Sequence, residues 1–209
     1  WHLPFPTPKP KNYNNMILDL EKKVNTLFNT PSDINEHFPA IIEYGQKCDH
    51  ITEMGVRGIV STWAWMASMP SKLIAYDIQD PSTWNSPLQD VYDTAEAYNV
   101  DFKFHLSNVL EVEIEETDLL FLDTWHSYKQ LKAELELHAD KAKKYICFHD
   151  TTSYENHDET SYEEWGDEWK AEGIGIWKAI EEFLDSHPEW EMEKRFTHNN
   201  GFTIIKRVK

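Results

Sequence analysis

Short apolar runs recur along the chain, separated by stretches with apolar residues at helical spacing. Runs of about five to eight residues that are apolar throughout, or alternate with polar residues, are typical of strands. The run 118–122 is apolar after its first residue, Asp118, as expected of a central parallel strand buried on both faces. The pattern predicts one strand that begins at His50 and stops at Gly55, and others over 72–76, 101–106, 118–122, 144–149, 190–197 and 202–208.

Helical spacing predicts two helices before the first strand. The first spans 15–29, and the second runs to Tyr44 with Ser32 or Asp33 as its cap. A proline-bearing loop is expected over 80–87. Further helices are expected after Gly58 and over 88–98, 128–143 and 176–184.

Strands that alternate with helices imply a doubly wound α/β fold with a mostly parallel sheet. Asn199-Asn200-Gly201 separates the last two strands, and Asn-Gly is a strong hairpin signal. We therefore expect a seven-stranded sheet with a C-terminal antiparallel hairpin.

We expect one domain over 13–209, in which residues 13–49 form a helical cover. Residues 151–174 are polar, acidic and aromatic without periodicity, and they predict a loop or lid. Residues 1–12 carry proline at positions 4, 6, 8 and 10, which favours an extended arm or linker.

A glycine turn and an acidic residue follow the first two strands. Glu53-x-Gly55-x-x-Gly58 leads into a helix, and Asp77 ends the next strand about 20 residues past the turn. Glycine lets backbone approach a ligand closely, a helix N-terminus offers free N–H groups, and a carboxylate can accept both ribose hydroxyls. The pattern favours a nucleoside ligand; the alternative is an ordinary β-α-β unit whose glycines only form a turn.

This glycine motif resembles the first motif of the class I S-adenosylmethionine-dependent methyltransferases, and Asp77 matches that family's ribose-binding acidic residue. The resemblance implies a Rossmann-like fold and S-adenosyl-L-methionine as cofactor, with the helical cover over the cofactor cleft. The cofactor residues it implies are Glu53, Gly55, Gly58, Ser61, Thr62, Asp77, Ser107 and Asn108.

Two further acidic residues, each with a histidine nearby, lie at predicted strand ends. Asp123 and His126 follow the strand 118–122, and His149-Asp150 ends the strand 144–149. In open α/β sheets ligands bind at the carboxyl ends of strands, and carboxylates with an imidazole can hold Mg²⁺ or Mn²⁺. The alternatives are that Asp123 caps the following helix and that the histidines are core residues.

This second region resembles one branch of the family, which includes macrolide-sugar and aminocoumarin-sugar O-methyltransferases and cephalosporin-hydroxylase-like proteins. Their pattern is D-x-x-H after the fourth strand and an acidic pair after the fifth. It implies that Asp123 and Asp150 are metal ligands and that His126 is the general base. This chain departs from the pattern because it has His149 before Asp150. We expect His149 as the third metal ligand, which would favour Mn²⁺; the alternative is that its side chain points into the sheet.

Composition restricts the partners. The net charge of −17 argues against a nucleic-acid backbone or an anionic membrane surface. No apolar run approaches about 20 residues, so no membrane span is expected. Cys48 and Cys147 lie in or beside apolar runs, which favours buried free thiols and a cytoplasmic location. Because the chain begins at Trp1, we expect a piece of a longer protein, fused to other glycan-modifying domains.

The sequence thus predicts a metal-assisted O-methyltransferase that acts on a hydroxyl of a sugar, glycan or other small molecule. One alternative is a catechol-type O-methyltransferase with an aromatic diol as acceptor. The other is a cofactor-binding module without chemistry.

Overall fold

A computed structural model of the protein describes residues 3, 19–161 and 173–209, and the chain divides into two compact units, Trp1–Asn108 and Val109–Lys209. Apart from Leu3, the predicted proline-rich arm lies outside the described residues, as do residues 162–172 of the predicted lid. The predicted single domain over 13–209 stays a prediction.

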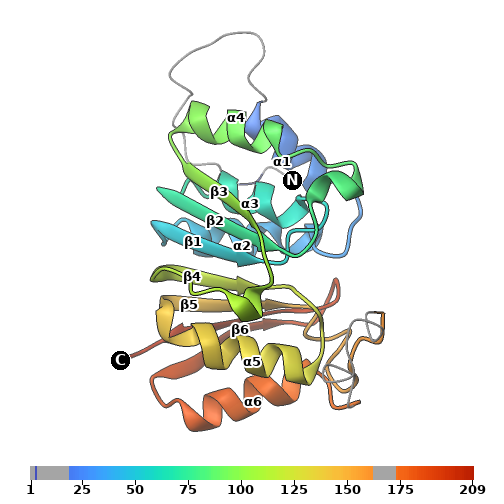
Figure 1. The fold of residues 1–209 in the computed structure, drawn as a ribbon, viewed down its shortest axis with the longest axis vertical. Coiled ribbons are helices and arrows are strands. Elements are labelled where there is room, and N and C mark those ends of the chain that lie inside the picture. Colours follow the sequence, from blue (N-terminus) through green and yellow to red (C-terminus); the bar gives the residue numbers. More distant parts are fainter. Residues whose placement is uncertain (1–2, 4–18, 162–172) are drawn as a thin grey trace. The chain divides into compact units, whose positions relative to one another are not determined.

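The first unit contains three parallel strands in the order β3-β2-β1 (Figure 1). Their bounds are His50–Met54 for β1, Lys72–Asp77 for β2 and Asp101–Leu106 for β3. In β1 and β2 most side chains are buried, as expected of parallel strands that are covered on both faces.

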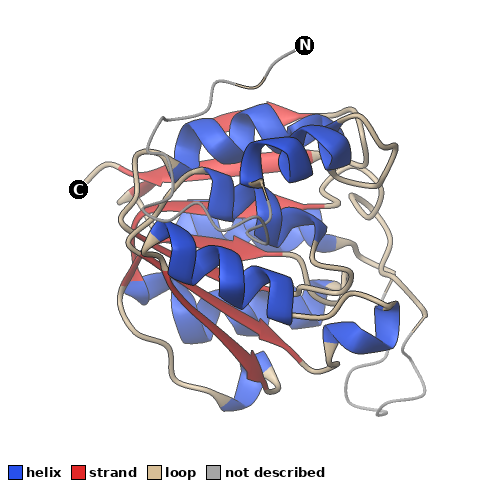
Figure 2. Cartoon of the chain, turned by 90° about the horizontal axis from the view of Figure 1, so that it is seen from above, coloured by secondary structure: helices blue, strands red, loops and turns tan. Residues whose placement is uncertain are grey.

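Helices connect these strands along the chain. Figure 2 shows the helices of the chain in blue and its strands in red. Two helices, α1 and α2, precede β1 and both pack against α3, so the predicted helical cover is part of this unit's core. The helices are α1 Leu20–Phe28, α2 Phe38–Gly45, α3 Val60–Ala67 and α4 Gln89–Tyr98, with 3₁₀ turns η1 Asn35–His37 and η2 Pro81–Trp84.

One prediction in this unit needs correction. The second helix does not run from residue 32 without a break, because a 3₁₀ turn precedes α2. Ser32 Oγ accepts the N–H of Asn35 at 3.0 Å, so the predicted cap serves the 3₁₀ turn instead. The loop 80–87 contains η2, which Asp80 caps by accepting the N–H of Ser82 at 2.8 Å.

The second unit contains four strands in the order β4-β5-β7-β6. β5 is parallel to β4 and antiparallel to β7, and β6 and β7 form the predicted hairpin. The hairpin turn requires a glycine, because Gly201 has φ +93° and a β-carbon there would lie 2.5 Å from the Thr152 nitrogen. The strands are β4 Thr117–Leu122, β5 Ala142–His149, β6 Trp190–Phe196 and β7 Phe202–Arg207.

Two α-helices of this unit, α5 and α6, pack against each other (Figure 1). The predicted helix 128–143 was too long: α5 stops at His138, a 3₁₀ turn follows, and β5 starts at Ala142. Apolar spacing cannot separate an α-helix from a closing 3₁₀ turn. The elements are α5 Tyr128–His138 and α6 Ile176–Ser186, with η3 Val109–Glu111 and η4 Ala139–Lys141.

The observed strands confirm the predicted fold class. It is a doubly wound α/β fold with seven mostly parallel strands and a C-terminal antiparallel hairpin. Cys48 and Cys147 are buried thiols that form no disulfide with each other, as predicted. Among the described residues, no helix is both long enough and apolar enough to cross a membrane.

Candidate active site

The glycine turn after β1 is held by Asp77 at the end of β2. Gly55 has φ +90°, a backbone conformation that residues with a β-carbon rarely adopt. Asp77 Oδ2 accepts the backbone N–H groups of Val56 at 2.7 Å and Arg57 at 2.9 Å. Asp77 Oδ1 accepts the N–H of Gln79 at 2.8 Å. The structure thus brings two of the predicted cofactor residues, Gly55 and Asp77, into one turn.

Glu53 lies beneath this turn and is fully buried. Its two carboxylate oxygens accept the hydroxyl groups of Ser61 and Thr62, each at 2.6 Å. These bonds connect the end of β1 to the first turn of α3, so three more of the predicted cofactor residues form one buried cluster. Gly58 has open space around it, since a β-carbon there would meet only Ser86 Oγ, at 3.9 Å.

The last two predicted cofactor residues follow β3. Ser107 donates its backbone N–H to the carbonyl of Asp77 at 2.8 Å, and the side chain of Asn108 is exposed. Two apolar side chains at these strand ends are exposed, Ile78 after Asp77 at 48% and Leu106 before Ser107 at 59%.

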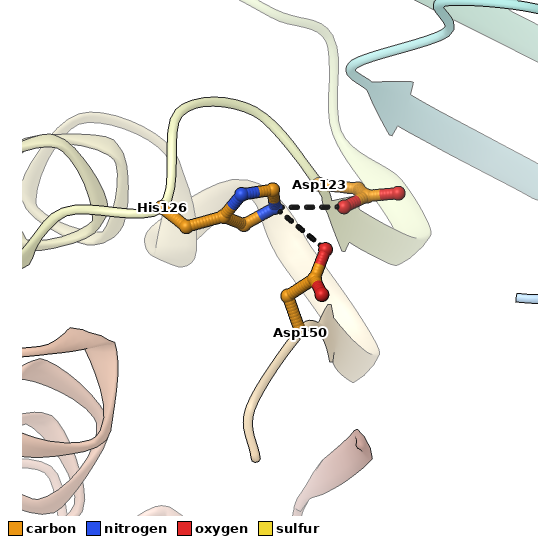
Figure 3. A group of neighbouring side chains, drawn as sticks. All are labelled: Asp123, His126 and Asp150. Atoms are coloured by element: carbon orange, nitrogen blue, oxygen red, sulfur yellow. Dashed lines mark hydrogen bonds and ion pairs between the residues drawn. The ribbon is translucent and has the colours of Figure 1, made fainter. Parts of the chain in front are cut away.

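In the second unit, Asp123 follows β4, Asp150 follows β5, and His126 lies in the loop that leads to α5 (Figure 3). His126 Nε2 lies 3.1 Å from both Asp123 Oδ1 and Asp150 Oδ2. His149 Nδ1 lies 3.3 Å and 3.2 Å from the same two oxygens. The four residues predicted at these strand ends are therefore brought together. Ser127, not Asp123, caps α5, by accepting the N–H of Gln130.

Glu159 completes this cluster and was missed in the sequence. Its Oε2 lies 2.8 Å from His126 Nδ1. Glu159 falls in the segment 151–174, which has no hydrophobic period, so no spacing could select it from the other acidic residues there.

The charges of the cluster stabilise one another. Burial raises the pKa of Asp123, but the charges and hydrogen bonds of His149 and His126 outweigh it and hold that pKa well below its ordinary value. Burial lowers the pKa of His126, but hydrogen bonds to Asp123 and Glu159 and the charge of Asp150 raise it to about 10. The pKa of His149 is likewise raised well above its ordinary value, by Asp123 and Asp150 against the effect of burial. The neighbouring carboxylates therefore favour the protonated form of both imidazoles in this arrangement.

The donor atoms fit a divalent cation. Asp123, His126 and Asp150 each offer one ligand atom, and these atoms all lie within 4.8 Å of one another. An octahedral ion with bonds of about 2.1 Å holds neighbouring ligands about 3 Å apart, close to the 3.3 Å and 3.2 Å from His149 Nδ1 to the two aspartate oxygens. With His149 as the ligand, His126 Nε2 would keep its lone pair for a proton. Two carboxylates and an imidazole suit Mg²⁺ or Mn²⁺.

Glu134 on α5 is buried behind the cluster, where it lines a small cavity with His126 and His149. Its Oε1 accepts the side chains of Thr124 and Gln130, the latter at 2.8 Å. Burial nevertheless raises the pKa of Glu134 to about 7, because these hydrogen bonds offset only part of the lost hydration.

This pKa predicts a pH-dependent stability. Because the folded pKa lies above the ordinary value of 4.5, the folded protein binds the extra proton between about pH 4.5 and 7. The free energy of unfolding should fall as the pH rises through this window, by roughly 3 kcal/mol. Glu134→Gln removes this titrating group, so urea unfolding should show the advantage of wild type over the variant shrinking from pH 5 to pH 7.5.

Glu136→Gln is the matched control, since Glu136 is exposed on the same helix. Its stability difference from wild type should be the same at both pH values. An equal pH dependence for all three proteins would contradict the assignment.

The family of the chain follows from comparisons with known proteins. Residues 25–207 match the family model described as rhamnosyl O-methyltransferase/CmcI. No curated protein matches the chain significantly.

Solved structures share the fold. An O-methyltransferase from Bacillus cereus in complex with SAH has a TM-score of 0.56 at 13% identity, covering 95% of this chain and 93% of that one. The SAH-bound methyltransferase PaMTH1 from Podospora anserina has a TM-score of 0.55 at 13% identity, covering 94% and 89%. A putative caffeoyl-CoA O-methyltransferase from Staphylococcus aureus has a TM-score of 0.55 at 13% identity, covering 93% of each chain.

With the fold, the glycine turn and the family match in agreement, the chain belongs to the rhamnosyl O-methyltransferase/CmcI family and is a class I S-adenosylmethionine-dependent O-methyltransferase.

Proposed function

We propose that this enzyme methylates a hydroxyl group of a sugar or glycan with the help of a divalent cation. The observation that carries the proposal is the convergence of His126 Nε2 on Asp123 and Asp150, at 3.1 Å from each. The rhamnosyl O-methyltransferases in the family's description support a sugar as acceptor. We also propose a cytoplasmic location, which the two buried cysteines support because they form no disulfide with each other.

The charge of the cluster supports a neutral acceptor. Asp123, Asp150 and Glu159 bring three carboxylates to one imidazole, and a divalent cation would balance only two of these charges. The cluster therefore offers no surplus positive charge to an acceptor with phosphate or carboxylate groups. Tyr154 lies parallel to the His126 ring, with 4.9 Å between the ring centroids. Aromatic faces of this kind contact the apolar side of a sugar ring well.

The chemistry is a single displacement. The methyl group leaves the sulfonium sulfur and bonds to the acceptor oxygen, while the hydroxyl proton passes to His126 Nε2; the products are S-adenosylhomocysteine and a methyl ether. Asp123 and Asp150 would hold the cation, with His149 beside them. When bound, a divalent cation supplies positive charge that lowers the pKa of the acceptor hydroxyl and replaces the proton charge that His126 otherwise carries.

The turn after β1 binds the cofactor in this proposal. Asp77 Oδ2 accepts two backbone N–H groups and Oδ1 accepts one, so Oδ1 keeps a lone pair for a ribose hydroxyl. Gly58 leaves open space beside the turn. Glu53, Ser61 and Thr62 hold the turn from below, and Ser107 and Asn108 stand near the adenine.

Asp77→Ala should weaken S-adenosylmethionine binding by about 10–100-fold, the cost of losing a charged hydrogen-bond acceptor. Isothermal titration calorimetry measures the affinity. Asp80→Ala is the control, since the Asp80 side chain caps η2 by accepting the N–H of Ser82. Unchanged affinity in Asp77→Ala would refute the cofactor assignment.

The function is tested with methyl-labelled S-adenosylmethionine and two probe acceptors, p-nitrophenyl α-L-rhamnoside and catechol. Label should pass to the rhamnoside, stop after chelation with EDTA, and resume when Mg²⁺ or Mn²⁺ is restored. Transfer to catechol alone would favour the catechol-type alternative. Cofactor binding with no transfer would favour the non-catalytic module, and full activity after chelation would refute the role of the metal.

His126→Ala should reduce turnover by roughly 10²–10⁴-fold, the usual effect of losing a positioned base, while the affinity for S-adenosylmethionine stays unchanged. Wild-type activity should rise with pH through the His126 titration, because only the neutral imidazole accepts a proton. His157→Ala is the control, an exposed histidine in the same unit that contacts Tyr154. A large loss of Mn²⁺ affinity in His126→Ala would instead identify His126 as a metal ligand.

A further inference from the structure

We propose that Glu159 is a positioning residue: it holds the Nδ1–H of His126 and thereby presents Nε2 to Asp123 and Asp150. The catalytic consequence of this contact rests on the proposed function, whereas the contact itself does not.

The first argument is the geometry of the imidazole. His126 Nδ1 lies 2.8 Å from Glu159 Oε2, and its Nε2 faces the two aspartates on the opposite side of the ring. With Nδ1–H donated to a carboxylate, Nε2 is the nitrogen left to exchange a proton or to meet a cation. The parallel ring of Tyr154 covers one face of the imidazole and limits its tilt.

The second argument is that Glu159 is fixed to the loop it controls. Its backbone N–H donates to the carbonyl of His126 at 2.8 Å, and its carbonyl accepts Trp125 Nε1 at 3.0 Å. Its carboxylate also accepts the backbone N–H of His126 at 3.3 Å. Backbone and side chain therefore move together with His126.

The third argument is that the neighbouring residue secures the segment independently. Asp158 is buried and accepts the N–H groups of Tyr128 at 2.8 Å, Gly175 at 2.9 Å and Gly173 at 3.1 Å. Since Asp158 anchors the segment to the start of α5, the Glu159 carboxylate is not needed as the segment's anchor. Its side chain is 13% exposed, so its bond to His126 is shielded from water.

The contact is tested first by nuclear magnetic resonance of the histidine ring N–H groups in the ¹⁵N-labelled protein, without an acceptor. Wild type should show a hydrogen-bonded Nδ1–H resonance that disappears in His126→Asn. Glu159→Gln should keep a shifted resonance, because its amide oxygen still accepts the bond. Glu159→Ala should lose it to exchange with water, and a resonance unchanged in Glu159→Ala would overturn the proposal.

The second test is turnover of p-nitrophenyl α-L-rhamnoside. Glu159→Ala should reduce kcat by about 10–100-fold, the usual cost of losing the carboxylate that orients such a histidine. Glu159→Gln should recover part of the loss, and the KM for S-adenosylmethionine should not change. The double variant His126→Ala/Glu159→Ala should be no slower than His126→Ala, because the glutamate acts through the histidine. If the two kcat losses multiply in the double variant, the proposal is overturned.

Glu155→Ala is the matched control. Glu155 lies in the same segment and pairs with Arg195 at 2.9 Å. It should keep both the resonance and the wild-type kcat.

The outcomes separate the two proposals. If wild type does not methylate the rhamnoside, the proposed function fails, and the resonance alone decides the role of Glu159. If wild type is active and Glu159→Ala keeps its kcat, the positioning role fails and the function stands. Should Glu159→Ala not fold, Glu159→Gln decides: a resonance and a kcat both identical to wild type would overturn the proposal.

Discussion

The site of the second unit depends on one constraint: the negative charges of Asp123 and Asp150 have to be balanced by positive charge. Two carboxylates at the ends of adjacent parallel strands repel each other, and burial makes that repulsion costly. Two histidines meet the same pair of oxygens, and Glu159 balances the charge of one of them. Positive charge between the aspartates is thus required by the fold itself, whether protons or a cation supply it.

In the first unit, acidic side chains hold the glycine turn and the helix that follows it. Asp77 fixes the turn through backbone N–H groups, and Glu53 fixes the helix that follows through two hydroxyls. Acidic residues at strand ends therefore serve two purposes in this chain. Some support backbone from inside, and others face a place where a ligand can arrive.

Much of the fold and part of the site could be predicted from the sequence. The strands and the hairpin could be predicted because both depend on local sequence: the spacing of apolar residues marks a strand, and Asn-Gly marks the hairpin turn. Asp123, His126 and Asp150 could be predicted because parallel strands bring their ends to one edge. Glu159 could not, because its partner lies 33 positions away and its segment has no period. The hydrogen bonds from Ser61 and Thr62 to Glu53 could not be predicted either. Residue spacing alone does not show whether a carboxylate accepts buried hydroxyls of the protein or contacts a ligand.

The placement of β5 has a consequence for how the site opens. β5 is hydrogen bonded to β4 along one edge and to β7 along the other, and it carries His149 at its end, directly before Asp150. An opening that exposes its central amides has to break two ladders at once, so these amides belong to the slowest class in hydrogen exchange. Glu159 lies outside the sheet, in a loop that separate hydrogen bonds of Asp158 and Glu159 hold to residues 125–128. The two aspartates therefore stand at the ends of strands held by ladders, whereas the place of Glu159 depends on individual bonds.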